Sequence, residues 1–268
     1  MESMFSEKRL NKYIDNNRFV LYLQPQMSVQ SGQITGAQAS MRLETRSREL
    51  NIQKQSLVRL KKTGLFYLLD LHLLELVCRT LTDWNEQQHI EEVSMKISAN
   101  TLEREDIVTQ IQEIFYVYPC MDFMIRLQVC ETEEVKNWKQ FYENCHHLQE
   151  MGMGFAIDSY GSENTEPDMF RDACFDEIHM DSELTDEMER RTMDYLRVSV
   201  MIDMCLDAGK KSVAENVNSE AQYGILKKLG CDYVRGEYAG RPMAARDFEN
   251  LYFNDARVKI LKPRCACT

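Results

Sequence analysis

The sequence predicts an α/β protein folded as a (β/α)8, TIM-like barrel, and three observations support that class. From residue 19 onward, short apolar runs alternate with helical patterns, which is typical of a parallel sheet. Eight of these runs qualify as strands, the number that closes such a barrel. The chain has 268 residues, close to the size of that fold. A doubly wound open sheet is the alternative, but a glycine-rich phosphate loop does not follow the first strand.

The beginning of the chain predicts a helix followed by two strands. Residues 1–18 form a helical lead-in, with a helix over 5–15. Residues 19–24 are typical of a strand, which Pro25 is expected to close. A second apolar run over 33–43 follows a turn at Gly32, so the two strands can pair as a hairpin. The barrel is therefore expected to contain one antiparallel strand.

The rest of the chain predicts one long helix and then regular alternation. Residues 43–55 are expected to form a loop and 56–62 a short helix that ends at Gly64. The helix over 66–84 is apolar around most of its circumference, which favours the core over a dimer face. The later elements are strands at 93–98, 123–130, 155–158, 178–181, 212–215 and 233–236, and helices at 102–118, 133–151, 186–208, 220–229 and 245–253.

Composition excludes several classes of protein. Apolar residues make up 44% of the chain, enough for a large core, so global disorder is not expected. The net charge of −11 argues against binding to nucleic acid or to anionic membranes. We expect no membrane segment, since no apolar run reaches eighteen residues. The nine cysteines form no CxxC pair, which favours a reduced, cytoplasmic protein with its cysteines packed as small hydrophobic residues.

Polar side chains stand at or near the ends of most predicted strands. In a barrel these ends converge on the active face, so a candidate site follows. The alternative is that strand ends are polar because they meet water, and the pattern alone does not separate the two interpretations. The residues are Gln38, Arg42, Lys96, Glu131, Asp158, Ser159, His179, Asp181, Glu215 and Arg235.

Short motifs at these positions follow one another in a fixed order. They are QPQ at 24–26, GAQASMRL at 36–43, KIS at 96–98, CE at 130–131, DSYG at 158–161, HMD at 179–181, AENVN at 214–218 and RGE at 235–237. In order and spacing they resemble the EAL domain family, the (β/α)8 barrels that hydrolyse cyclic di-GMP. The resemblance implies a barrel domain over 19–253 in bacterial cyclic di-GMP signalling, with a tail over 254–268.

The departures from the family pattern concern the metal site. The family binds two divalent cations, and the resemblance implies that Glu131, Asp158, Asp181 and Glu215 keep metal-site positions. Five catalytic positions are altered: Gln38 and Ser159 replace acids, Lys96 an asparagine, His179 a lysine and Arg235 a glutamine. Two carboxylates are lost and two cations gained, so we expect Mg²⁺ to be repelled. We therefore expect a degenerate member that binds no metal or other cofactor, in which Lys96 pairs with Glu131 or Asp158. It is expected not to be an enzyme.

Ligand binding is a separate question. The resemblance implies that Gln24, Arg42 and Pro242 occupy positions that contact the dinucleotide, which would allow metal-free binding of cyclic di-GMP. A structural role for Gln24 and Arg42 is equally compatible with the sequence. A regulatory module could also act through a protein partner, an adjacent signalling domain or a homodimer. The alternative function is an active cyclic di-GMP phosphodiesterase with an atypical metal site.

One further motif is a weak candidate for a metal site. The run Cys145-His146-His147 looks ligand-like, but adjacent residues on a helix point to different sides.

Overall fold

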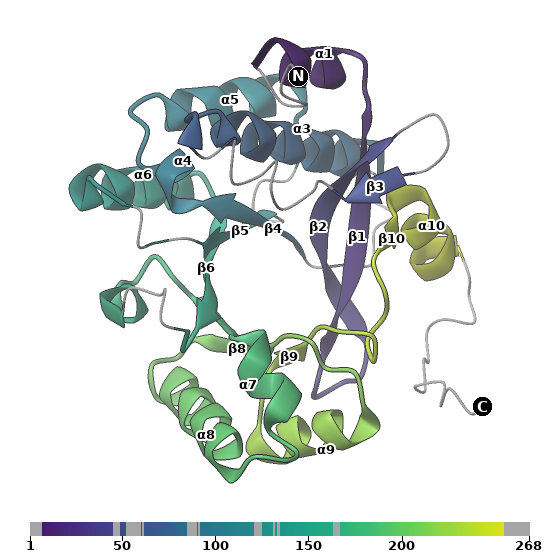
Figure 1. Ribbon diagram of the computed structural model, residues 1–268, viewed down its shortest axis with the longest axis vertical. Coiled ribbons are helices and arrows are strands. Elements are labelled where there is room, and N and C mark those ends of the chain that lie inside the picture. Colours follow the sequence, from purple (N-terminus) through teal and green to yellow (C-terminus); the bar gives the residue numbers. More distant parts are fainter. Residues whose placement is uncertain are drawn as a thin grey trace.

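A closed barrel of eight strands forms the centre of the molecule in the computed structural model (Figure 1). The structure describes residues 7–44, 49–51, 60, 62–84, 90, 92–120, 125–130, 132, 135–162 and 167–254. Around the ring the strands are β1 (Phe19–Ser28), β2 (Ile34–Glu44), β4 (Glu92–Ser98), β5 (Ile125–Cys130), β6 (Gly154–Tyr160), β7 (Glu177–Met180), β8 (Lys211–Ala214) and β9 (Tyr233–Val234).

The ring is parallel except at β1. Strands β2 and β4 to β9 pair in parallel around the barrel, and β1 closes it by antiparallel pairing with β2 and β9. The predicted barrel class, the hairpin and the single antiparallel strand of the ring are thus confirmed. Because β1 runs against the others, its amino-terminal end lies at the same rim as their carboxyl ends.

The prediction that Pro25 ends the first strand was wrong. Pro25 does not end β1, which continues to Ser28 with Pro25 opposite Ala37 of β2. On its other side β1 changes partner, from β10 (Met243–Ala244) at Tyr22 and Leu23 to β9 at Met27 and Ser28. The missing N–H of Pro25 falls between those two pairings, where it removes no ladder bond.

A short strand also lies where a loop was expected. Strand β3 (Glu49–Asn51) pairs antiparallel with residues 42–44 of β2. Strand β4 pairs only with residues 36–39 of β2, so the end of β2 would otherwise expose unpaired backbone groups. The addition of β3 covers that edge.

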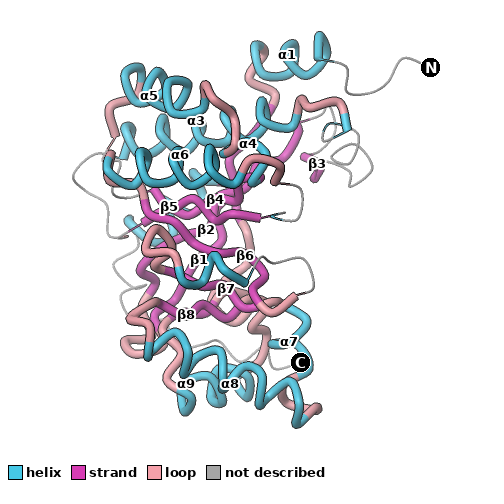
Figure 2. The backbone as a smooth tube through the Cα atoms, turned by 90° about the vertical axis from the view of Figure 1, so that its left-hand side faces the viewer, coloured by secondary structure: helices cyan, strands magenta, loops and turns pink. Residues whose placement is uncertain are grey.

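The helices pack outside the ring. Figure 2 shows α3, α5 and α6 at one end of the view, α8 and α9 at the other, and the strands between them. Several predicted helices are divided, since 102–118 contains the end of α4 and then α5, and 186–208 contains the end of α7 and then α8. The helices are α1 (Glu7–Asp15), α3 (Phe66–Trp84), α4 (Ala99–Leu102), α5 (Ile107–Val117), α6 (Trp138–Glu150), η4 (Pro167–Arg171), α7 (Ser182–Glu187), α8 (Thr192–Asp207), α9 (Glu220–Leu229), α10 (Ala245–Glu249) and a π-helical turn η5 (Asn250–Asn254).

The break between α4 and α5 has a polar cause. The Glu103 carboxylate accepts hydrogen bonds from the backbone N–H groups of Lys136 and Asn137, at 2.8 and 2.9 Å. This contact ties the end of α4 to the segment before α6, and Arg104 pairs with Asp106 at the start of α5. The predicted 56–62 helix and the 254–268 tail lie mostly outside the described residues.

Helix α3 belongs to the core, as its apolar pattern predicts. Its buried residues include Leu69, Leu74 and Leu81, which join the main hydrophobic cluster with strands β4 to β7. None of the helices in the described part of the chain is long and apolar enough to span a membrane.

Candidate functional site

An ion pair lies at the carboxyl ends of the parallel strands. The ammonium group of Lys96, near the end of β4, lies 2.8 and 3.0 Å from the two carboxylate oxygens of Asp158 in β6. It also lies 4.0 Å from a carboxylate oxygen of Glu215, which directly follows β8. The Lys96 side chain is 44% exposed and that of Asp158 is 6% exposed, so Asp158 is buried and Lys96 reaches the solvent at the rim. The expected pairing of Lys96 with a carboxylate is present at Asp158.

The backbone bends where the two carboxylates are presented. The register between β6 and β7 shifts between Ile157 and Tyr160, and Ser159 within that shift has a φ of 49°. Asn216, the residue after Glu215, has a φ of 59°. Bulges and left-handed non-glycine residues are uncommon and are concentrated near functional sites, where they redirect side chains. Asp158 and Glu215 are therefore each followed directly by a residue in the left-handed backbone conformation.

Gln128 of β5 links the rim carboxylates and was not predicted from the sequence. Its amide nitrogen donates to Asp158 at 2.7 Å and to Glu215 at 2.9 Å. Its amide oxygen accepts from Gln38 at 2.8 Å and from Arg235 at 3.2 Å. A glutamine amide has two donors and two acceptor sites, so this fully buried side chain is completely satisfied. Strand β5 alternates polar and apolar residues, and that period of two is the signal that could have placed Gln128 in the interior.

Arg235 and His179 extend the buried network that Gln128 begins. Arg235 donates to Glu215 at 2.8 Å and to the Ser94 hydroxyl at 3.2 Å, and it also contacts His179. The other ring nitrogen of His179 lies 2.6 Å from the carboxylate of Glu177. Both altered family positions thus face the barrel interior, and both are at most 2% exposed.

These contacts shift the pKa values of Glu215 and Lys96. Burial by itself raises the pKa of Glu215, but the charges of Arg235 and Lys96 outweigh it and hold that pKa well below its usual value. Burial lowers the pKa of Lys96, but Glu215 and Asp158 outweigh it and raise that pKa. Lys96 and Glu215 are therefore both charged at neutral pH.

The polar network continues to the opposite end of the barrel. Glu177 lies 3.7 Å from Arg126, whose guanidinium also contacts Glu92 at 2.9 Å and Asp176. Burial raises the pKa of Glu177, but the hydrogen bond from His179 and the charge of Arg126 reverse the effect and hold it below its usual value.

A second group of predicted residues lies on the β1–β2 hairpin. Gln24 stands directly opposite Gln38 in the register and donates to the backbone oxygen of Gly240 at 3.2 Å. The guanidinium of Arg42 lies over the ring of Tyr22, 3.7 Å from its centroid. Side chains two and four residues apart on a strand share a face, so Arg42 lies on the same face as Gln38, nearer the rim.

The remaining predicted residues are not part of this network. Asp181 caps α7, since its carboxylate accepts a hydrogen bond from the backbone N–H of Glu183 at 2.8 Å. Pro242 is exposed in the segment between β9 and β10. Glu131 lies outside the described residues.

The described residues do not fit a pair of divalent cations. The Lys96 ammonium contacts both oxygens of Asp158, the atoms that a metal would need. Among the described carboxylates, Asp158, Asp181 and Glu215 do not form a set whose oxygens all lie within 4.8 Å of one another. A lysine ammonium has only donors and cannot act as a ligand while it is protonated.

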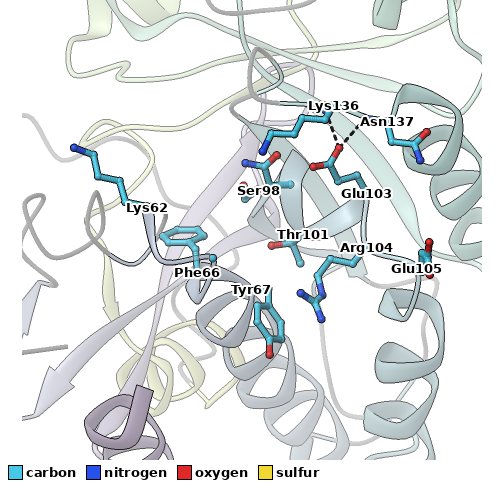
Figure 3. A pocket seen from close by; sticks show the side chains of 12 residues that line it. Lys62, Phe66, Tyr67, Ser98, Thr101, Glu103, Arg104, Glu105, Lys136 and Asn137 are labelled. Atoms are coloured by element: carbon cyan, nitrogen blue, oxygen red, sulfur yellow. Dashed lines mark hydrogen bonds between the residues drawn. The ribbon is translucent and has the colours of Figure 1, made fainter. Parts of the chain in front are cut away.

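A pocket of about 550 Å³ lies beside the rim (Figure 3). It is formed by the start of α3, by α4 with the loop after it, and by the segment before α6. It includes Ser98 at the end of β4, but none of the predicted site residues lines it. Figure 3 shows Phe66, Tyr67 and Arg104 around it, and Arg104 stacks on the Tyr67 ring at 3.8 Å.

Comparison with known proteins identifies relatives of the whole barrel. The EAL domain profile matches residues 7–242. The signalling protein YkoW of Bacillus subtilis is 25% identical over 245 residues, which are 91% of this chain and 31% of that protein. The bifunctional diguanylate cyclase/cyclic di-GMP phosphodiesterase MucR of Pseudomonas aeruginosa is 25% identical over 88% of this chain and 35% of its own length. The chain thus spans about a third of the length of these two relatives.

A solved structure agrees with the sequence comparison. The PaMucR phosphodiesterase in its cyclic di-GMP complex is 25% identical, with a TM-score of 0.81 over 90% of this chain and 98% of that one. The expectation that this chain is not an enzyme was wrong, because the relatives that match it include named cyclic di-GMP phosphodiesterases and its fold matches one of them. The change of five catalytic positions was too narrow a basis for that conclusion.

Proposed function

The chain belongs to the EAL domain family, and on that basis we propose that it binds cyclic di-GMP at the rim of its barrel. The observation that carries the proposal is the shared face of Gln24, Gln38 and Arg42 on the β1–β2 hairpin. A relative of the same fold is named as a cyclic di-GMP complex, which supports this ligand.

Arg42 is the residue that we assign to a phosphate of the ligand. A guanidinium offers paired N–H donors in a plane, and this geometry matches two phosphate oxygens. Stacking on Tyr22 leaves the edge of the guanidinium available for such contacts while it limits the side chain's freedom. The amides of Gln24 and Gln38 are neutral and can meet either the bases or the sugars of the ligand.

We also propose that binding does not require Mg²⁺. The positive charge that a metal would bring near a phosphate comes from Lys96 and Arg235, which already neutralise Asp158 and Glu215. Ejecting the Lys96 ammonium to admit a cation would break two hydrogen bonds and leave the lysine without its partner.

Hydrolysis of the bound dinucleotide by an atypical site is the second candidate function. The likeness to a solved phosphodiesterase favours it. Asp158 and Glu215 remain at the rim as charged carboxylates, so groups able to orient a water molecule are present.

The test is calorimetric titration of cyclic di-GMP into the purified chain with and without Mg²⁺, with chromatography of each mixture for the linear product. We expect binding in both buffers, weakened roughly 10-fold or more by Arg42→Ala, since a hydrogen bond to a charged group contributes about 1.5–3 kcal/mol. The matched control is Arg9→Ala, because Arg9 also stacks on a tyrosine, Tyr13, but lies on α1.

Each outcome decides something. Binding that appears only with Mg²⁺, or that Arg42→Ala and Arg9→Ala leave equal, contradicts the proposed site. Linear product formed in the wild-type mixture establishes the second candidate. Absence of heat in both buffers contradicts cyclic di-GMP binding and directs attention to a protein partner.

The domain's place in signalling is part of the same proposal. Since the two relatives are about three times as long as the matched region, we propose that the 19–253 barrel works beside an adjacent signalling domain or a protein partner. The lead-in before the barrel and the tail after it would then connect to such a partner.

A further inference from the structure

Three metal-ligating side chains meet outside the barrel, away from the rim. His146 lies in the second half of α6, and Asp172 and Cys174 lie in the turn between η4 and β7. Their ligand atoms all lie within 4.8 Å of one another, and Nε2 of His146 is 3.7 Å from Oδ1 of Asp172. The turn leads into the amino end of β7, so this cluster is on the side of the barrel opposite to the carboxyl ends that carry Lys96 and Asp158.

The donor set is specific. It combines an imidazole nitrogen, a carboxylate oxygen and a thiol, and a second thiol, that of Cys145, contacts Cys174. Hard cations such as Mg²⁺ avoid sulfur ligands, whereas Zn²⁺ takes nitrogen, sulfur and oxygen together in tetrahedral sites. His146 keeps 47% of its side-chain surface exposed and both cysteines are buried, so the cluster is open to solvent on one side only.

The surrounding contacts hold the ligands in place. Oδ1 of Asp172, the oxygen nearest to His146, accepts a hydrogen bond from the backbone N–H of Cys174 at 2.8 Å, and a carboxylate oxygen has a further lone pair for a metal. The Lys210 ammonium donates to the backbone oxygens of Asp172, at 2.9 Å, and Phe175. The turn is therefore fixed by groups that are not ligands, and the helix carries His146 and Cys145 at fixed positions beside it.

We propose that His146, Asp172 and Cys174 bind one Zn²⁺, with a water molecule as the fourth ligand on the side where His146 is exposed. The bound cation would join α6 to the turn before β7. Sequence alone did not suggest this arrangement, because Asp172 and Cys174 lie more than twenty residues away from His146.

The protonation of the thiols gives the proposal a second readout. A zinc-bound thiol is deprotonated, so binding of the metal through sulfur must release a proton.

The experiment is titration of Co²⁺ into the reduced chain, followed by displacement with Zn²⁺. Cobalt bound to thiolate shows a sulfur-to-metal charge-transfer absorption that cobalt bound to carboxylates lacks, so the signal separates this cluster from the rim. We expect one equivalent of Co²⁺ with that absorption, which Zn²⁺ removes. Titration in two buffers of different ionisation enthalpy should show proton release.

Variants then locate the site. Cys174→Ser should abolish the charge-transfer absorption, and His146→Gln should weaken binding at least ~10-fold. His146 is the safer test of the two because it is half exposed and its replacement should not disturb folding. The matched control is His147→Gln, the adjacent exposed histidine, which should bind as the wild type does.

Two results would overturn the proposal. One is Co²⁺ binding without the charge-transfer absorption. The other is equal affinity in the wild type, Cys174→Ser and His146→Gln.

Discussion

Replacement of Lys96 by asparagine tests whether its ammonium group neutralises the rim carboxylates in place of a divalent cation. In Mg²⁺-free buffer, Lys96→Asn removes both hydrogen bonds to Asp158 and leaves that carboxylate, 6% exposed, beside Glu215. A fully exposed ion pair contributes about 0–1 kcal/mol, and breaking a buried one costs about 3–5. Since Lys96 itself is 44% exposed, we expect a loss of roughly 1–3 kcal/mol in the free energy of unfolding.

Magnesium should then distinguish the variant from the wild type. An asparagine oxygen can act as a ligand, and its introduction leaves the rim with one more uncompensated negative charge. We expect Mg²⁺ to restore part of the lost stability of Lys96→Asn and to leave the wild type unchanged. Urea unfolding with and without Mg²⁺ measures both effects, because a ligand stabilises the state that binds it.

A second lysine provides the control. Lys211, at the start of β8, pairs with Asp232 at 2.9 Å, with side chains 56% and 29% exposed. Lys211→Asn should cost no more than about 1 kcal/mol and should gain nothing from Mg²⁺. Equal stabilisation of the wild type and Lys96→Asn by Mg²⁺ would refute the reasoning, and so would an Mg²⁺ response in Lys211→Asn.

Two other predictions concern the base of the barrel and the loop after β9. Burial, and then the charge of Glu177, raise the pKa of Glu92 to about 7, so its contribution to stability is full below about pH 4.5 and is lost as pH rises through about 7. Glu92→Gln should flatten that decline in thermal unfolding, and an unchanged profile would show that Glu92 is not its source. Gly236 has a φ of 148° and a Cβ there would overlap the Val217 backbone, so Gly236→Ala should cost at least ~2 kcal/mol in urea unfolding. Gly224→Ala, in open space on α9, should instead stabilise by about 0.5–1 kcal/mol, and similar losses in both variants would contradict the steric argument.

The sequence predicted the barrel and its rim because both depend on local patterns. Apolar runs of strand length located the strands of the ring, and polar residues at or near the ends of these runs located Lys96, Asp158 and Glu215. The small strands β3 and β10 were missed, since they exist only to cover edges that the ring leaves open. Such edges are a property of three-dimensional pairing, and a two- or three-residue strand carries no periodicity of its own.

The interior polar residues were missed for a different reason. Gln128 lies inside β5 and Glu177 begins β7, so attention to the carboxyl ends of the strands passed over both. Their spacing does carry a signal, because polar residues two apart on neighbouring strands face the same side. Which carboxylate meets which cation still could not be read from it, since the register between strands decides that.

The charges inside the barrel explain why Lys96 and Arg235 occur in the same protein. Among the described residues, the network runs from the rim to the base, and its carboxylate Asp176 is more than half exposed. The remaining charges besides Glu92 are three cations and three carboxylates: Lys96, Arg126 and Arg235 against Asp158, Glu177 and Glu215. Buried charges are tolerated only when they are paired, so this balance leaves Glu92 as the one surplus carboxylate. Its raised pKa, about 7, is the expected response, because a surplus carboxylate in a balanced interior holds its proton. If Lys96 and Arg235 were the neutral asparagine and glutamine that the family pattern has there, the same interior would carry two more unpaired negative charges. That surplus is what a divalent cation would neutralise, so these two residues together account for the charge of one metal ion.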